Sequence, residues 1–150
     1  MKEVVWKIKK FSELSTDELY IILKVRQEVF IVEQTCHYLD ADGYDQVGLH
    51  IWAEKDDEIV AYARVFAPGI KYNEASIGRV LTHPQFRSLK LGKTLIKFSL
   101  DVIEAQFRTQ TVRISAQDYL LGFYKGFGFQ DTGKKYLEDD IPHTEMLRSN

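Results

Sequence analysis

The sequence has 150 residues, a length typical of one domain. Hydrophobic residues make up 45% of it and aromatic residues 13%, which is enough apolar material for a packed core without disulfides or metal ions. The formal net charge is −2, so the chain lacks the basic field of proteins that bind nucleic acid without sequence preference. We therefore expect a single domain with no nucleic-acid partner.

The sequence carries no pattern of a secretion signal or a membrane span. Residues 1–11 contain charges throughout and lack the apolar region of a signal peptide. No apolar run approaches the roughly 18 residues of a membrane-spanning helix. Cys36 is the only cysteine, so no intrachain disulfide can form, which fits a reducing compartment. We expect a cytoplasmic protein that is not bound to a membrane.

The first third of the chain predicts a strand, a helix and a long loop. Residues 4–11 alternate between apolar and charged side chains, as in a half-buried strand. Ser15 and Glu18 have the spacing of a capping box, and the apolar residues behind them recur at helical steps as far as about Glu33. Residues 34–47 hold turn formers without any period. A loop of this length favours a functional role.

Strand patterns dominate the middle of the chain. Residues 50–54 and 58–66 form two strands of a hairpin with a charged turn between them. Residues 75–82 form a further strand, which His83-Pro84 ends. A second amphipathic helix is predicted from Leu91 to about residue 107.

The last part of the chain predicts short elements. Residues 111–116 are β-branched enough for a strand, Asp118 can cap a brief helix to about Phe127, and one or two short strands follow. The predicted order is therefore β-α-β-β-β-α-β-α-β, followed by a last strand, which indicates one α/β domain.

The stretch Gly92-Lys93-Thr94 ends like the phosphate-binding loop of nucleoside triphosphatases. That loop reads G-x-x-x-x-G-K-S/T, and its first glycine allows a tight turn around the phosphates. Arg87 stands at this first position, so the match is weak. The context still suits an anion, because a strand leads into a helix start with free amides, and Arg87, Lys90 and Lys93 add positive charge. Alternatively, Gly92 only eases the helix start and the cations are solvated.

Two later segments extend this pattern, ISAQDYLLGFYKGFGF (114–129) and YLEDDIPHTEM (136–146). With Arg87-x-x-Lys90-x-Gly92 upstream, the chain resembles the GNAT superfamily of acetyl-CoA-dependent N-acetyltransferases. In that superfamily the pyrophosphate loop reads R/Q-x-x-G-x-G/A, and a strand and an F-Y-x-x-x-G-F segment follow. Further segments look like the ElaA-type branch, and the resemblance spans roughly residues 19–146. These segments are VEQTCHYLDADGYD (32–45), VAYARV (60–65), IGRVL (77–81) and LEDDIPH (137–143).

The resemblance implies the GNAT fold, an α/β domain over residues 1–150 with a mixed, mostly antiparallel sheet flanked by helices. It implies acetyl-CoA as co-substrate and transfer of the acetyl group to a primary amine by direct attack in a ternary complex. The acceptor would be a small molecule or a peptide; a polyamine, a lysine and an N-terminus fit equally well. The histidines and Cys36 lack metal-site spacing, so we expect no metal. A homodimer is compatible with a domain of this size.

The resemblance also assigns the cofactor site. Free backbone N–H groups at the end of a splayed strand would meet the acetyl carbonyl and the pantetheine, at Val80, Leu81 and Thr82. The pyrophosphate would lie on the loop and helix start, at Arg87, Ser88, Leu89, Lys90, Leu91, Gly92 and Lys93. Gln117 matches a position where many family members have an asparagine bound to pantetheine. Lys90 departs from the family pattern, in which a glycine serves a positive φ or a close backbone approach.

Tyr124 is the candidate acid for the departing thiolate. A phenol with a pKa of about 10 is protonated at neutral pH and can donate its proton to sulfur. The alternative is that Tyr124 only packs on the core face of a short helix. Cys36 is not expected to act as a nucleophile, because transfer in this superfamily is direct and no histidine partner pattern supports a covalent route.

No general base is assigned by the sequence. Ionisable side chains in and around the loop could accept the proton of the amine or attract a cationic acceptor, or water could carry the proton. These candidates are Glu33, His37, Asp40, Asp42, Asp45, His50 and His143. The rival function is a non-catalytic acyl-CoA-binding or regulatory protein on the same fold, because a fold and a cofactor do not guarantee turnover. A binding protein would have no need of Tyr124.

Overall fold

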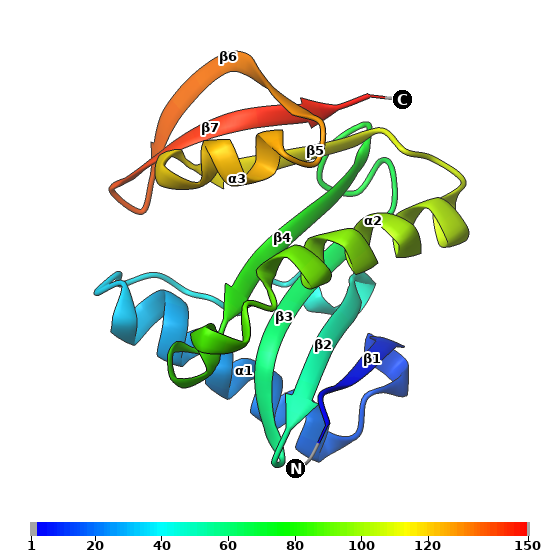
Figure 1. Cartoon of the computed structure of the whole chain (residues 1–150), viewed down its shortest axis with the longest axis vertical. Coiled ribbons are helices and arrows are strands. Elements are labelled where there is room, and N and C mark those ends of the chain that lie inside the picture. Colours follow the sequence, from blue (N-terminus) through cyan, green and yellow to red (C-terminus); the bar gives the residue numbers. More distant parts are fainter. Residues whose placement is uncertain (1–2, 150) are drawn as a thin grey trace.

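A seven-stranded sheet forms the centre of the computed structural model, which describes residues 3–149 (Figure 1). The strand order is β1-β2-β3-β4-β5-β7-β6, and every neighbouring pair is antiparallel except β4 and β5, which are parallel. The mixed, mostly antiparallel sheet is therefore confirmed. The strands are β1 (Val5–Lys10), β2 (Leu49–Lys55), β3 (Glu58–Phe66), β4 (Ala75–Thr82), β5 (Val112–Gln117), β6 (Phe129–Glu138) and β7 (Ile141–Arg148).

Helices cover both faces of the sheet. Helix α1 (Thr16–Arg26) packs on one face, where Ile22 lies in a core cluster with Trp52 and Tyr62. Helix α2 (Gly92–Phe107) packs on the other face, and α3 (Leu121–Lys125) lies near β5 (Figure 1). Because both faces of β3 are covered, all its residues after Glu58 are buried. The remaining helical segments are η1 (Phe11–Glu13), η2 (Gln27–Glu33), η3 (Asp45–Val47), η4 (Pro84–Leu89) and η5 (Asp118–Leu120).

The predicted elements are present in the predicted order, with two differences. The capping box of the first helix is confirmed, since Ser15 Oγ accepts from the Glu18 amide at 3.0 Å and the Glu18 carboxylate accepts from the Ser15 amide at 2.9 Å. The helix does reach Glu33, but residues 27–33 form a π-helix. The prediction of short final strands was wrong, because β6 and β7 have 10 and 8 residues. Most of β6 is exposed, so its polar sequence lacks the apolar alternation that would have predicted a long strand.

Strands β4 and β5 pair only briefly and then separate. Their register contains two pairs, Ala75 with Val112 and Ser76 with Arg113. Farther along β4 the register with β3 shifts, and Arg79 takes a φ of 49°. A residue of this kind inside a strand bends it away from its neighbour. Figure 1 shows the two strands diverging from this point, which leaves a gap in the ladder at the centre of the sheet.

A buried network of ion pairs lies beside the bend of β4. Arg26 contacts Asp40 and Asp45 at 2.8 and 2.7 Å. Arg64 contacts Asp45 and Asp42, both at 2.8 Å. Three arginines and three aspartates are joined in this way, because Arg79 Nε lies 2.9 Å from Asp40 Oδ1 and Arg79 Nη2 lies 3.4 Å from Asp42 Oδ2. The network fixes the 34–47 loop to α1, β3 and β4.

The network corrects the expected role of the loop carboxylates. Burial tends to raise the pKa values of Asp42 and Asp45, but the hydrogen bonds from the arginines outweigh it and hold both below the usual range. Asp40 is only 6% exposed and is shared by Arg26 and Arg79. The loop aspartates are therefore neutralised within the protein, and Asp40 is not available to attract a cationic acceptor.

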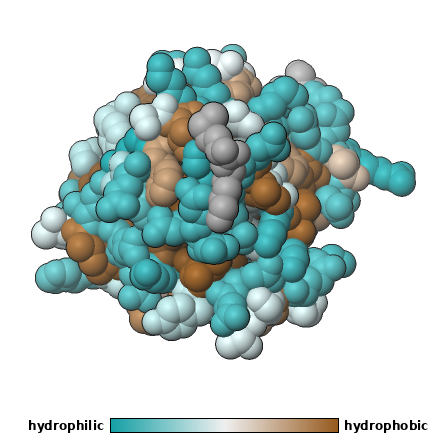
Figure 2. Space-filling view, turned by 60° about the horizontal axis from the view of Figure 1, so that its bottom comes forward, coloured by the Kyte–Doolittle hydropathy of each residue, from teal (hydrophilic) through white to brown (hydrophobic). Residues whose placement is uncertain are grey.

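The surface has no extended apolar band on the face drawn in Figure 2. Hydrophobic residues there form separate patches between hydrophilic ones, as on most folded domains. Within residues 3–149, no helix is both long and apolar enough to cross a membrane.

Replacing Arg26 by methionine tests whether the network holds the fold. We expect the free energy of unfolding in urea to fall by about 3 kcal/mol, because Asp40 and Asp45 each lose a buried partner. The loss should be smaller in acid. Since Asp45, one of the two partners of Arg26, has a lower pKa folded than unfolded, its stabilisation is complete above the unfolded pKa of about 4 and is lost as the pH falls through the lower folded pKa.

Lys97→Met provides the matched control, because it removes a cation from the exposed pair that Lys97 forms with Asp101. We expect that change to alter the free energy of unfolding by less than about 0.5 kcal/mol. Equal effects of the two substitutions would show that the buried network does not hold the fold.

Candidate active site

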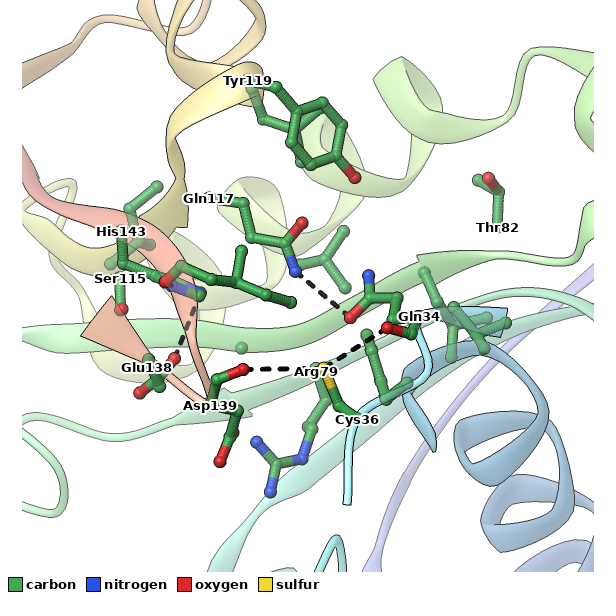
Figure 3. Close-up of a pocket in the computed structure, with 18 of the residues that line it drawn as sticks. Gln34, Cys36, Arg79, Thr82, Ser115, Gln117, Tyr119, Glu138, Asp139 and His143 are labelled. Carbon is green, nitrogen blue, oxygen red and sulfur yellow. Dashed lines mark hydrogen bonds and ion pairs between the residues drawn. The ribbon is translucent and has the colours of Figure 1, made fainter. Parts of the chain in front are cut away.

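A cavity of about 620 Å³ opens where β4 leaves β5 (Figure 3). Its walls come from the end of η2, the second half of β4, the start of α2, the end of β5, α3 and the turn between β6 and β7. Segments far apart in the chain therefore meet at the gap in the sheet. The predicted site residues that line it are Glu33, Val80, Leu81, Thr82, Arg87, Gly92, Gln117, Tyr124 and His143.

Other predicted residues lie outside this lining. The loop residues Ser88, Leu89, Lys90, Leu91 and Lys93 flank the cavity next to Arg87 and Gly92. His37 is exposed and lines a second hollow of about 590 Å³, which also contains Asp140.

His50 was a candidate base, and the structure gives it a structural role instead. It is fully buried, its Nε2 donates to the Asp45 carbonyl at 2.9 Å, and its Nδ1 lies 2.7 Å from the Tyr62 hydroxyl. Burial lowers its pKa, so the neutral ring is favoured.

The end of β4 presents backbone donors to the cavity. The His83 amide donates to the Val60 carbonyl at 2.9 Å, so the antiparallel alternation directs the Leu81 amide toward β3 and the Thr82 amide away from it. The Val80 amide, two residues before Thr82, faces the same side as Thr82 by this alternation. Leu81 was also expected to offer its amide to the acetyl group, but this amide points toward β3 and the Leu81 side chain is buried in the core. The Val80 and Thr82 amides therefore face the side of β4 from which β5 has departed.

The segment before α2 has the geometry of an anion site. Lys90 ends η4 with φ 54° and ψ 47°, a left-handed conformation that glycine adopts at low cost. Lys90 thus keeps the backbone geometry for which glycine is suited. The first helical bond runs from the Leu95 amide to the Leu91 carbonyl, and Leu91 caps the helix without a side-chain acceptor. The amides of residues 92–94 therefore point out of the helix start, where an anion is favoured.

Arg87 and Glu33 form an ion pair at the edge of the cavity. Arg87 Nη1 lies 2.8 Å from Glu33 Oε2, and Nη2 lies 2.6 Å from Oε1. Arg87 Nη2 also donates to the Thr82 carbonyl at 3.3 Å. The hydrogen bonds with Glu33 raise the pKa of Arg87. Glu33 closes the π-helix, whose wide turns recur at functional sites in other proteins.

Tyr124 lines the cavity from α3 and is largely buried. Its ring makes edge-to-face contacts with Phe123 and Phe129, at centroid distances of 5.2 and 5.8 Å. Burial raises the pKa of the phenol well above its ordinary value, so the hydroxyl stays protonated at neutral pH. The ring packs in the core and also lines the cavity, so the packing alternative is present and the role of Tyr124 as the acid stays a prediction.

His143 and its hydrogen-bond partners form another part of the cavity wall. Its Nδ1 lies 2.7 Å from the Ile141 carbonyl and its Nε2 lies 3.2 Å from the Glu138 carboxylate. Tyr136 stacks on the imidazole at a centroid distance of 6.1 Å. Figure 3 shows His143 and Glu138 on one side of the cavity and Gln34 with Gln117 on another.

Comparison with known proteins identifies the family. A family model described as an acetyltransferase (GNAT) domain matches residues 23–149. This chain belongs to the GNAT acetyltransferase family. Among its relatives is protein ElaA of Escherichia coli, 39% identical over 97% of this chain and 96% of that protein. A UPF0039 protein of Synechocystis is 37% identical over 97% of this chain and 95% of that protein.

Solved structures agree with this GNAT assignment. An acyl-CoA N-acyltransferase from Pseudomonas aeruginosa superposes with a TM-score of 0.91 at 37% identity, over 97% of this chain and 99% of that one. The crystal structure of Escherichia coli ElaA gives the same TM-score over 98% of this chain and 100% of that one. The GNAT fold and the resemblance to the ElaA-type branch are confirmed. Membership supports an acyltransferase with an acyl-CoA co-substrate and an amine acceptor.

Sequence reasoning missed several residues of the GNAT site. Gln34 accepts a hydrogen bond from Gln117 at 3.4 Å, although the two are far apart in the chain. The spacing of residues in the sequence does not predict a contact between two residues so far apart. Further lining residues that were not singled out include Cys36 as a wall residue, Tyr38, Arg79, Ser115, Tyr119, Glu138 and Asp139. Within residues 3–149, no three or more His, Cys, Asp and Glu side chains are grouped so that they could hold a metal ion.

Substitutions of Lys90 test the left-handed geometry of the loop. Lys90→Gly should leave the free energy of unfolding unchanged or higher by up to about 1 kcal/mol, because glycine takes this φ without strain. Lys90→Val should lower it by about 1–2 kcal/mol, since a β-branched side chain is strongly disfavoured there. Urea unfolding of both variants measures the difference. Lys93→Val, at the start of α2, is the control, and an equal loss there would contradict the left-handed loop.

Proposed function

We propose that this protein is an N-acetyltransferase that uses acetyl-CoA and acetylates a primary amine by direct attack in a ternary complex. One observation carries the proposal. Backbone amides at the end of β4, the start of α2 and the protonated Tyr124 all belong to one continuous cavity and its rim. These groups would stabilise the carbonyl oxygen, bind the pyrophosphate and protonate the leaving thiolate.

The residues of the cavity fit an acyl-CoA molecule. A diphosphate requires several N–H donors and positive charge, and the start of α2 with Arg87, Lys90 and Lys93 offers both. A thioester carbonyl requires donors in a site shielded from water, which the Val80 and Thr82 amides would supply. Gln117, whose amide already bonds to Gln34 and which lines the cavity, would bind the pantetheine arm. When bound, acetyl-CoA supplies the activated acetyl group.

The catalytic roles follow from these positions. The amides of Val80 and Thr82 would donate to the carbonyl oxygen as negative charge develops on it. The Tyr124 hydroxyl would donate to the sulfur as it leaves. Holding the amine against the carbonyl makes the attack effectively unimolecular, which supplies a large part of the rate.

Two of the candidate bases share the cavity with these groups. Glu33 and His143 line it, whereas His37 and His50 lie elsewhere. The proton of the attacking amine therefore has two candidate acceptors in the lining of the cavity. We propose a small molecule or a peptide as the acceptor.

The rival function, an acyl-CoA-binding protein without turnover, uses the same cavity but not the acid. The buried phenol of Tyr124 favours the enzyme. A binding protein gains nothing from a hydroxyl at that position, and phenylalanine would fill the same aromatic cluster.

Tyr124→Phe separates the enzyme from the binding protein. We expect kcat to fall about 100-fold or more, because a positioned acid contributes that much to a proton transfer. The affinity for CoA, followed by the increase in melting temperature, should change by less than about twofold. Acetyl transfer would be followed by release of free CoA with a panel of polyamines, lysine derivatives and peptide N-termini.

Tyr20→Phe is the control, since Tyr20 is 70% exposed on α1 and does not line the cavity. A Tyr124→Phe variant as active as Tyr20→Phe would exclude Tyr124 as the acid. Binding of CoA without transfer to any amine of the panel would favour the rival function.

A further inference from the structure

The ion pair of Glu33 and Arg87 connects two segments that border the cavity. Glu33 comes from the end of the π-helix, and Arg87 comes from the loop that leads into α2. Both contacts of the pair are short, at 2.6 and 2.8 Å, and they engage both carboxylate oxygens. A paired, two-point contact of this kind fixes the direction of the guanidinium.

The pair is also easy to break. The Arg87 side chain is 48% exposed and that of Glu33 is 34% exposed, so water can replace either partner. The buried pairs of Arg26 and Arg64 are different, because separating them would leave unsolvated charges. Compared with these buried pairs, Glu33–Arg87 is thus suited to exchange.

Under the proposed function, Arg87 has a second partner. Its guanidinium lies on the loop expected to hold the pyrophosphate, and the N–H groups that contact Glu33 are those that would contact phosphate oxygens. Glu33 therefore competes with the pyrophosphate for the same donors. Within residues 3–149, Arg87 is the sole cation at ion-pair distance from Glu33, so loss of Arg87 would leave that carboxylate free in the cavity.

We propose that Glu33 is a positioning residue for the acceptor, and that it exchanges Arg87 for the ammonium group of the amine when acyl-CoA binds. This inference rests on the proposed function. In the free protein Arg87 neutralises Glu33, and a cationic amine has little to bind. Once the pyrophosphate holds Arg87, the Glu33 carboxylate attracts the ammonium and holds the acceptor in the cavity. The ammonium must then lose a proton, to Glu33 or His143 in the cavity lining, before its nitrogen attacks the thioester.

The exchange couples the two substrates. Because coupling between two binding sites is reciprocal, acyl-CoA raises the affinity for the amine by the same factor by which the amine raises the affinity for acyl-CoA. The preferred acceptor is therefore an amine that arrives as a cation, and it binds best after acyl-CoA.

A double-mutant cycle on CoA affinity tests the competition. Glu33→Gln should bind CoA about two- to fivefold more tightly than the unchanged protein in calorimetric titration at low salt, because Arg87 no longer has to leave a partner. In the Arg87→Gln background the same substitution should change the affinity by less than about 1.5-fold. Asp101→Asn removes one negative charge from the exposed pair on α2 and serves as the charge control.

The second arm measures the acceptor. With the most active amine of the polyamine, lysine and peptide panel, Glu33→Gln should raise the KM of the amine about tenfold while the KM of acetyl-CoA stays equal or falls. Substitution of a residue that only supports the fold would not raise the KM of the amine while the KM of acetyl-CoA stays equal or falls. Melting temperatures check that each variant is folded.

Several results would overturn the exchange. The exchange would be wrong if Glu33→Gln bound CoA no more tightly than Asp101→Asn does. It would also be wrong if Glu33→Gln raised the CoA affinity equally in the Arg87→Gln background, because that would indicate long-range repulsion alone. An unchanged KM for the amine would remove the acceptor role. In each case CoA still binds, so the proposed function stands. Absence of CoA binding to the unchanged protein would overturn both the exchange and the proposed function.

Discussion

The departure of β4 from β5 is the feature on which the rest of the site depends. A sheet normally continues its ladder, because unpaired strand amides are costly when buried. Here the ladder stops after Ser76, and Arg79 holds a backbone conformation that costs about 1–3 kcal/mol. The guanidinium of Arg79 is held by Asp40 and Asp42, so the ion-pair network stabilises the bend. The result is a cavity at the centre of the sheet with free donors on its wall.

Burial divides the charges of the molecule into two sets. The aspartates of the 34–47 loop are paired with arginines away from water, and they serve to hold the loop and the bent strand together. The Glu33–Arg87 pair at the cavity is more exposed, and in the salt bridges of the described residues each of the two has only the other as its partner. Fixed pairs build the site, whereas exchangeable pairs are available to substrates. The net charge of the chain, −2, describes neither set.

Local patterns in the sequence predicted what local interactions decide. The capping box at Ser15, the strand boundaries of β3 and β4, and the start of α2 depend on neighbouring residues. The pairing of Asp40 depends on residues 14 and 39 positions away, so local sequence patterns do not show that the loop aspartates belong to an internal salt-bridge network. The π-helical end of the first helix has the same apolar spacing as an α-helix over so few residues. Family motifs located the cavity, but the choice of Val80 and Thr82 over Leu81 required the strand register.

The central claim is that acyl-CoA lies between the parted strands and bonds to the end of β4. Amide hydrogen exchange of Val80, Leu81 and Thr82, followed by NMR with and without acetyl-CoA, tests it most directly. We predict that the Leu81 amide is already protected in the free protein, and that acetyl-CoA slows exchange at Val80 and Thr82. Saturation with acetyl-CoA that leaves the exchange rates of Val80 and Thr82 unchanged would contradict the claim.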